Sequence, residues 1–152
     1  MITHNQKYAD NVANESYPEH RDVPLDDFFA DDRGEIRNLL LSSFTSVARI
    51  SSKAGSVRAN HYHLTDWHYA FVESGTVLYF ERPIGDDHVA EPAKYVSGTM
   101  FFTPPLVEHA MVFPEDTVIY TFAKNKRSHE EHEADVKRVN FITPEVLARY
   151  IK

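Results

Sequence analysis

Short β-rich runs, divided by turn residues at a nearly regular spacing, fill the centre of the chain. Between residues 36 and 124 these runs are rich in Val, Ile, Thr, Tyr and Phe. Turns recur about every ten residues, which is typical of an antiparallel sandwich or barrel. No helical period lies between them. We therefore expect an all-β fold, with turns at residues 55, 65–66, 74–75, 83–87, 97–98, 104–105 and 114–116.

The two ends of the chain differ from this centre. Residues 1–27 are polar and aperiodic, which predicts an N-terminal arm. Ser128 and Glu131 have capping-box spacing and predict a short helix, and Thr143 before Pro144 predicts a second one. We predict an arm at 1–27, a barrel at 28–127 with its strands at about 35–123, and a helical segment at 128–152 that packs on the barrel.

Composition excludes several classes of function. The 152 residues fit one domain, and a net charge of −7 without a basic stripe argues against nucleic acid. No run reaches the roughly 18 apolar residues of a membrane span, and no signal peptide is visible, so we expect no membrane partner and a cytoplasmic location. Cysteine is absent, so a transition-metal site must use imidazole and carboxylate ligands.

Histidines crowd into one stretch, "HYHLTDWH" at 61–68. Side chains alternate along a strand, so His61 and His63 share a face, and a turn at "LTD" lets His68 face the same pair. His109 lies on a later strand. Four imidazoles from three strands would suit Zn, Ni, Cu or Fe(II). The alternative is a set of unrelated histidines that are solvated or hydrogen-bonded in the core.

The spacing of these histidines resembles the two motifs of the cupin superfamily. Residues 55–75 are similar to the first motif, G-x5-H-x-H-x4-E-x6-G, with His68 in place of the glutamate. Residues 98–113 are similar to the second motif, G-x5-P-x-G-x2-H-x3-N. The matching positions are Gly55, His61, His63, Gly75, Gly98, Pro104 and His109, and Leu106 and Phe113 replace the glycine and asparagine of the second motif.

The cupin resemblance implies an RmlC-like jelly-roll barrel, also called a double-stranded β-helix, and a metal site. Its ligands would be His61, His63, His68 and His109, and its cofactor one divalent transition metal (Zn, Ni or Fe). An all-imidazole set leaves the charge of the ion uncompensated, which strengthens its attraction for an anionic substrate. Alternatively, His68 turns away and leaves three histidines with open coordination positions.

A narrower resemblance concerns "VRANHYH". It is similar to a strand of nucleotide-sugar cupins, the 3,5-epimerases and 3,4-ketoisomerases, and of cupin domains in capsular sugar biosynthesis. There His61 would be the catalytic base and Arg58 a substrate-binding residue, with Ala59 replacing the usual glycine. Strand alternation places Arg58 on the face opposite His61 unless the strand has a bulge. Because a metal-bound His61 cannot accept a proton, we predict that His61 is a ligand and that another group transfers any proton.

Other side chains are weaker candidates. Tyr79 could present its hydroxyl to a substrate, although an ordinary core aromatic has the same pattern. The "HEEH" at 129–132 lacks the second histidine of H-E-x-x-H, because position 133 is Glu133. We therefore interpret His129 and His132 as part of a solvated helix face.

Three functions remain compatible with the sequence. The first is a metal-dependent isomerase or epimerase acting on a small polar substrate, a carbohydrate derivative. The alternatives are an Fe-dependent dioxygenase and a cupin that binds a small molecule without turnover. We also expect a homodimer, in which Tyr8, Val12 and Tyr17 of the arm pack on a neighbouring barrel.

Overall fold

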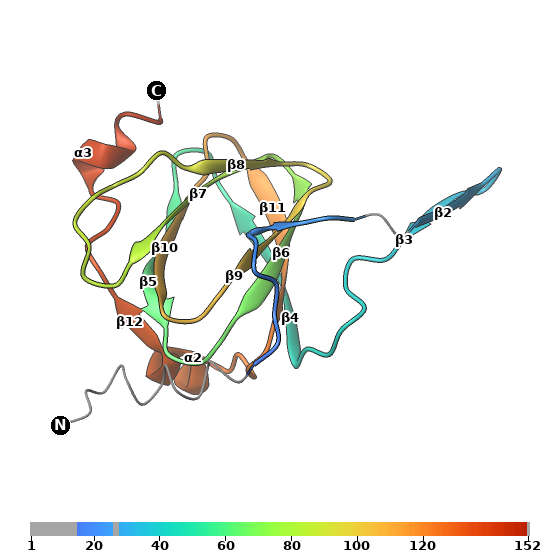
Figure 1. Ribbon diagram of the computed structural model, residues 1–152. Helices are drawn as coiled ribbons and strands as arrows, with labels where there is room; N and C mark the ends of the chain where they lie inside the picture. Colours follow the sequence, from blue (N-terminus) through green and yellow to red (C-terminus); the bar gives the residue numbers. More distant parts are fainter. Residues whose placement is uncertain (1–14, 26–27, 152) are drawn as a thin grey trace.

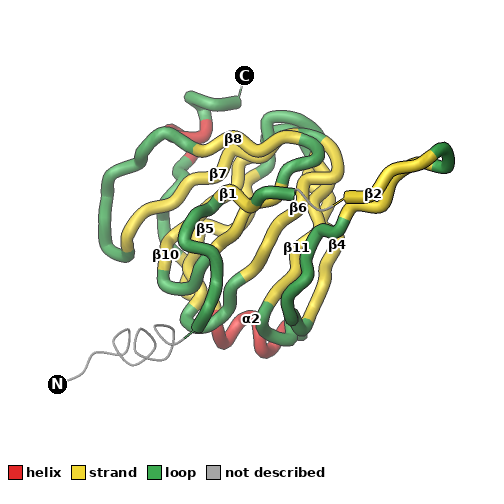
Figure 2. The backbone as a smooth tube through the Cα atoms, turned by 45° about the vertical axis from the view of Figure 1, so that its right-hand side comes forward, coloured by secondary structure: helices red, strands yellow, loops and turns green. Residues whose placement is uncertain are grey.

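The chain forms a sandwich of two antiparallel sheets with five strands each (Figures 1 and 2). The computed structural model describes residues 15–25 and 28–151. The first sheet contains β1 (Asp22–Val23), β9 (Met100–Thr103), β6 (His68–Ser74), β11 (Thr117–Ala123) and β4 (Ser46–Ser52), in this order. The second contains β12 (Val136–Arg138), β5 (Val57–His63), β10 (Val107–Val112), β7 (Thr76–Pro83) and β8 (Ala93–Val96). The all-β prediction is confirmed.

The predicted turns separate consecutive strands from β4 to β11. At one of them, Gly75 has a φ of +90° and lies against Thr117, so only glycine fits there without strain. Between the sheets, alternate side chains meet in a core that includes Val72, Phe101 and Ile119, each with 0% exposure. The alternating burial of β11 shows the period of two that places one face inward.

The N-terminal segment 15–25 packs on its own barrel. Asp22 and Val23 pair with β9, so part of the predicted arm is a strand of the first sheet. Tyr17 stacks on Phe102 with ring centroids 5.4 Å apart. Our expectation that Tyr17 would pack on a neighbouring barrel is therefore wrong, because the apolar outer face of its own sheet is the surface that it covers. Tyr8 and Val12 lie outside the described residues.

The hairpin of β2 (Phe28–Asp31) and β3 (Gly34–Arg37) extends away from the sandwich (Figures 1 and 2). Its eight residues are all exposed. The predicted barrel began at residue 28, whereas the first strand of the sandwich after this hairpin is β4. The difference arises because a β-rich pattern does not reveal which sheet a strand joins.

The C-terminal segment contains the two predicted helices and an additional strand. Helix α2 (His129–Asp135) follows Ser128, whose side chain makes no capping hydrogen bond. Helix α3 (Pro144–Leu147) is capped by the hydroxyl of Thr143 and is shorter than "PEVLARYI". Between them, β12 pairs with β5. Packing of this segment against the outer face of the second sheet buries Phe141 and Ile142.

No helix in residues 15–25 and 28–151 is long and apolar enough to cross a membrane.

Candidate metal centre

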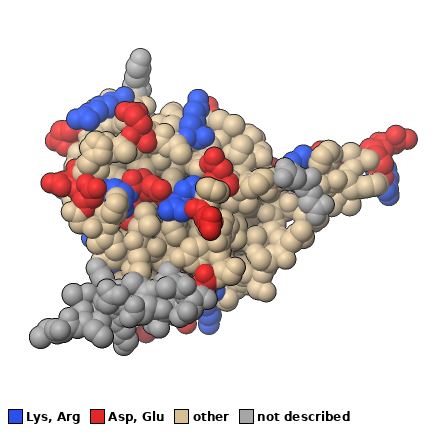
Figure 3. All heavy atoms as spheres, in the orientation of Figure 1, with Lys and Arg blue, Asp and Glu red and all other residues tan. Residues whose placement is uncertain are grey.

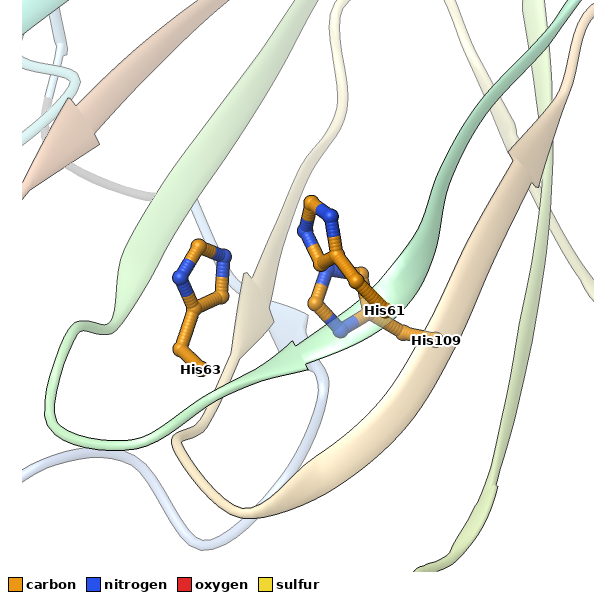
Figure 4. A group of neighbouring side chains, drawn as sticks. All are labelled: His61, His63 and His109. Carbon is orange, nitrogen blue, oxygen red and sulfur yellow. The ribbon is translucent and has the colours of Figure 1, made fainter. Parts of the chain in front are cut away.

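Three of the four predicted ligands converge between the sheets (Figure 4). His61 and His63 lie on β5, and His109 lies on β10 directly opposite His61. One ring nitrogen of each lies within 4.8 Å of the others. The ring of His61 is centred 4.7 Å from that of His63 and 4.8 Å from that of His109. His61, His63 and His109, which belong to two separate sequence motifs, are therefore neighbours in space.

The outer nitrogens of two rings are fixed by hydrogen bonds. Nδ1 of His63 donates to a carboxylate oxygen of Asp135 at 3.2 Å, and Nδ1 of His109 donates to the carbonyl oxygen of Val107 at 3.1 Å. The opposite nitrogens, Nε2 of His63 and of His109, are buried without a hydrogen-bond partner. Histidines that bind metals show this arrangement, in which one nitrogen is held by an acceptor and the other is free. The residues present fit a divalent ion.

His68 lies beside this group but outside it. It comes from β6 of the opposite sheet, and its ring is centred 5.8 Å from that of His63 and 5.9 Å from that of His109. Its Nδ1 is buried without a hydrogen-bond partner. In this conformation three histidines form the compact set, and a rotation of the His68 side chain could bring in a fourth.

Burial favours the neutral, metal-binding form of His61, His68 and His109. Burial, followed by the neighbouring imidazoles, lowers the pKa of His61 and of His68. Burial and His63 lower the pKa of His109 to about 3. Burial would raise the pKa of Asp135, but hydrogen bonds from His63, Thr65 and the backbone N–H of Asp66 lower it to about 2. An ionised carboxylate therefore supports the ring of His63.

A β-bulge brings Arg58 to the same cavity as His61. The pairing of β10 with β5 shifts between His109 and Ala110, so that Asn60 is the extra residue. Ala59 and Asn60 have φ values of 69° and 55°, in the left-handed region. The Asn60 amide replaces the missing strand contacts by bonding the backbone N–H and carbonyl of Ile142. Because of this extra residue, the side chains of Arg58 and His61 lie on the same side of β5 and not on opposite sides.

The histidines open into a cavity of about 170 Å³. Two of its lining residues, Arg127 and His132, were not among the predicted site residues. The His132 ring is centred 5.8 Å from that of His63 and 6.1 Å from that of His61. The lining residues are Ile50, Arg58, Ala59, His61, His63, His68, His109, Met111, Thr121, Arg127 and His132.

Helix α2 brings His132 to the cavity because its last residues cap the turn between β5 and β6 (Figure 1). Asp135 accepts hydrogen bonds from the backbone N–H groups of Thr65 and Asp66. The only sequence signal for this role was the "HEEH" pattern, which we interpreted as a solvated face. His129 is exposed, as that interpretation expected, whereas His132 is half-buried.

Tyr79 lies in the core and not on the cavity wall. Its side chain is 2% exposed and packs against Phe101, with ring centroids 5.1 Å apart. Burial raises the pKa of its hydroxyl above the usual value. Its ring stacks near that of His109, with centroids 6.3 Å apart, but Tyr79 is not among the residues that line the cavity with Arg58.

The arrangement of the two sheets is the cupin jelly-roll fold, as the comparisons with solved structures show. The chain is similar to a 3,4-ketoisomerase from Helicobacter canadensis, with 13% identity over 88% of this chain and 98% of that one and a TM-score of 0.64. It is also similar to the QdtA 3,4-ketoisomerase from Thermoanaerobacterium thermosaccharolyticum in complex with TDP. There the identity is 18% over 88% of this chain and 95% of that one, with a TM-score of 0.59.

A third similar structure is the capsular polysaccharide assembling protein CapF from Staphylococcus aureus. The identity is 24% over 76% of this chain and 34% of that one, with a TM-score of 0.53. No protein-family model matches the sequence, and no curated protein matches it either. These likenesses establish the fold.

Proposed function

We propose that this protein is a metal-dependent isomerase or epimerase of a small carbohydrate derivative. The observation that carries the proposal is the group of His61, His63 and His109, whose ring nitrogens lie within 4.8 Å of one another. Two of those rings have buried Nε2 atoms without a partner, which a divalent ion would satisfy. The ketoisomerases with the same fold support the choice of reaction class.

Isomerisation next to a carbonyl needs a base that removes a proton and a centre that stabilises the resulting enolate. A divalent ion at the histidine cluster would supply that stabilisation as a Lewis acid. The chain must supply the proton transfer. His132 is placed for it, because it lines the cavity but lies outside the group of three convergent histidines.

Metal analysis and deuterium exchange together test this function. Protein purified without added metal should contain close to one divalent ion per chain, with nitrogen bonds of about 2.0–2.2 Å. The ion should be lost in the His61→Ala/His63→Ala double variant. In D2O, the loaded protein should exchange the proton next to the carbonyl of small keto sugars, as NMR detects, and chelation should abolish the exchange.

Two results would contradict the proposal. Protein with an intact fold and no bound metal would remove its basis. Full exchange in chelated protein, lost only in His61→Asn, would show instead that His61 is a free catalytic base. A metal-loaded protein that binds small molecules but exchanges no proton would favour the binding cupin without turnover.

The compact three-histidine set also favours a second candidate, an Fe-dependent dioxygenase. Such an enzyme needs two or three open positions on the iron for substrate and oxygen. Because His68 lies outside the group, three ligands leave that space. Oxygen consumption by Fe(II)-loaded protein in the presence of a substrate would identify this chemistry, and an oxygen-independent reaction would exclude it.

A further inference from the structure

The cavity at the histidine cluster contains cationic side chains and no carboxylate. Arg58 and Arg127 line it together with the histidines, and none of the lining residues is Asp or Glu. Within residues 15–25 and 28–151, neither arginine forms an ion pair. A divalent ion would add to the same positive charge. A site of this kind favours an anion, because its two guanidinium groups have no carboxylate partner among the residues that line the cavity.

Arg127 faces the histidines. One of its terminal nitrogens donates to the hydroxyl of Thr121 at 3.2 Å, which holds the guanidinium against β11. Arg127 lines the same cavity as His61, His68, His109 and His132. The remaining N–H groups of Arg127 have no partner among the described residues, so they are available to a ligand.

Arg58 borders the cavity from the opposite sheet. Its Nε donates to the hydroxyl of Ser52 at 2.7 Å, and one terminal nitrogen donates to the carbonyl of Ser51 at 2.8 Å. These bonds tie the guanidinium to the end of β4, and its other terminal nitrogen has no hydrogen-bond partner in the part of the chain that the structure describes. The bulge at Asn60 turns Arg58 of β5 toward the cavity, whereas Arg127 reaches it from the loop between β11 and α2.

The volume of the cavity limits the size of the ligand. About 170 Å³ corresponds to five or six water molecules at roughly 30 Å³ each, whereas pockets for larger ligands usually measure about 300 Å³ or more. A nucleotide sugar would have to leave its nucleotide outside. We propose that the substrate is a small carboxylic acid, such as a keto or hydroxy sugar acid, whose carboxylate binds Arg127 and Arg58 while its neighbouring oxygen approaches the histidine cluster. This inference rests on the proposed function, because it names the substrate class for the same site.

Calorimetry with malonate as a probe tests the inference. Malonate carries two carboxylates and is small, malonamide has the same skeleton without charge, and dTDP represents the nucleotide class. Metal-loaded protein should bind malonate at least tenfold more tightly than malonamide. Any binding of dTDP should be equally strong with and without the Arg127 side chain. Arg127→Gln should weaken malonate binding by about 10- to 100-fold, as expected for the loss of a hydrogen bond between charged groups. Arg58→Gln should weaken it less, because Arg58 is more exposed.

The matched control is Lys126→Gln, which removes the same charge one residue away from a side chain that does not line the cavity. It should leave malonate binding within about twofold. Unchanged malonate affinity in Arg127→Gln would overturn the inference, and so would equal affinity for malonamide or Arg127-dependent binding of dTDP alone.

Metal content, measured in the same samples, separates this inference from the proposed function. If the protein holds no metal but still binds malonate through Arg127, the metal-dependent function fails and the carboxylate site stands. If the protein holds metal and its affinity for malonate does not depend on Arg127, the proposed carboxylate site is refuted and the proposed metal centre is retained. Protein that binds neither metal nor malonate contradicts both.

Discussion

Asp135 is the residue that connects the C-terminal helix to the histidine cluster. Its carboxylate accepts hydrogen bonds from Nδ1 of His63 and from the hydroxyl and backbone N–H of Thr65. A carboxylate behind a metal-binding histidine fixes the ring orientation and increases the basicity of the ligand nitrogen. Asp135 therefore acts as a positioning residue, with no expected contact to the ion.

We predict that Asp135→Asn lowers metal affinity by about 10- to 100-fold, the usual loss when such a partner is removed. Competition with a coloured chelator measures the affinity directly and does not depend on enzymatic activity. Glu133→Gln is the control, because Glu133 is on the same helix and pairs with exposed Arg138. Equal affinities in the two variants would show that Asp135 supports the turn alone.

Asn60 determines whether β5 can keep its bulge. Its φ of 55° is in a region that asparagine tolerates better than most residues, and its side chain makes two hydrogen bonds to Ile142. We predict that Asn60→Ala lowers the free energy of unfolding by about 2 kcal/mol, mostly through those two bonds. Asn60→Gly loses the same two hydrogen bonds but adopts the positive φ without strain, so it should cost somewhat less, about 1.5 kcal/mol. Chemical denaturation measures both, and a loss below about 0.5 kcal/mol for Asn60→Ala would contradict this role.

Two residues explain how the motifs can depart from the cupin pattern and keep its geometry. Ala59 and Leu106 stand where the resembling sequences have glycine, and both retain positive φ values, 69° and 59°. The backbone N–H of Leu106 bonds the carbonyl of His63, which holds that loop against β5. The local conformation is therefore maintained by surrounding contacts, although each non-glycine residue there costs about 1–2 kcal/mol.

At the scale of elements, the turn between β6 and β7 allows no side chain at Gly75. A Cβ atom there would overlap the Thr117 hydroxyl and the carbonyl oxygen of Asp116, whereas at Gly98 nothing lies within 4 Å. Both glycines have positive φ, 90° and 86°. They form a matched pair that separates steric overlap from backbone strain.

We predict that Gly98→Ala lowers the free energy of unfolding by about 1 kcal/mol, the cost of the left-handed conformation alone. Gly75→Ala should cost about 1–3 kcal/mol more, because the overlap forces the turn away from β11. Thermal and urea unfolding should rank the variants in this order. Equal losses would mean that the turn adjusts without strain.

The sequence predicted the strands and the turns of the barrel well, because alternation and turn residues are local signals. The spacing of His61, His63 and His109 predicted that these three histidines would cluster, and that they bind a metal stays a prediction. The sequence did not predict Arg127 or His132, since no local signal tells which end of a barrel a C-terminal helix will cover. Strand β12 was missed for the same reason: three residues carry too little pattern, and only pairing with β5 defines them.

At the scale of the whole molecule, the β2–β3 hairpin carries three of the large apolar side chains that are exposed among the described residues: Phe28, Phe29 and Ile36. Phe29 and Ile36 lie directly opposite each other in its register, with 58% and 67% exposure. Charged side chains gather at the tip, where Arg33 pairs with Asp31 (Figure 3). An isolated hairpin of two short strands is only marginally stable in water, so a partner that covers it would stabilise it.

We expect this hairpin, and not the N-terminal arm, to form the interface of the predicted homodimer. A second copy offers the edge strand β4, with Val47 57% exposed, as an apolar surface that also has unpaired backbone groups.

We predict that light scattering at micromolar concentration gives about twice the 17.5 kDa of one chain. Phe29→Ser/Ile36→Ser should shift the mass toward a monomer, because it removes the apolar pair while leaving the charged tip intact. Val96→Ser, which replaces a 44% exposed side chain on β8, should leave the mass unchanged. A monomeric unmodified protein would contradict the dimer, and a dimer that survives the double substitution would place the interface elsewhere.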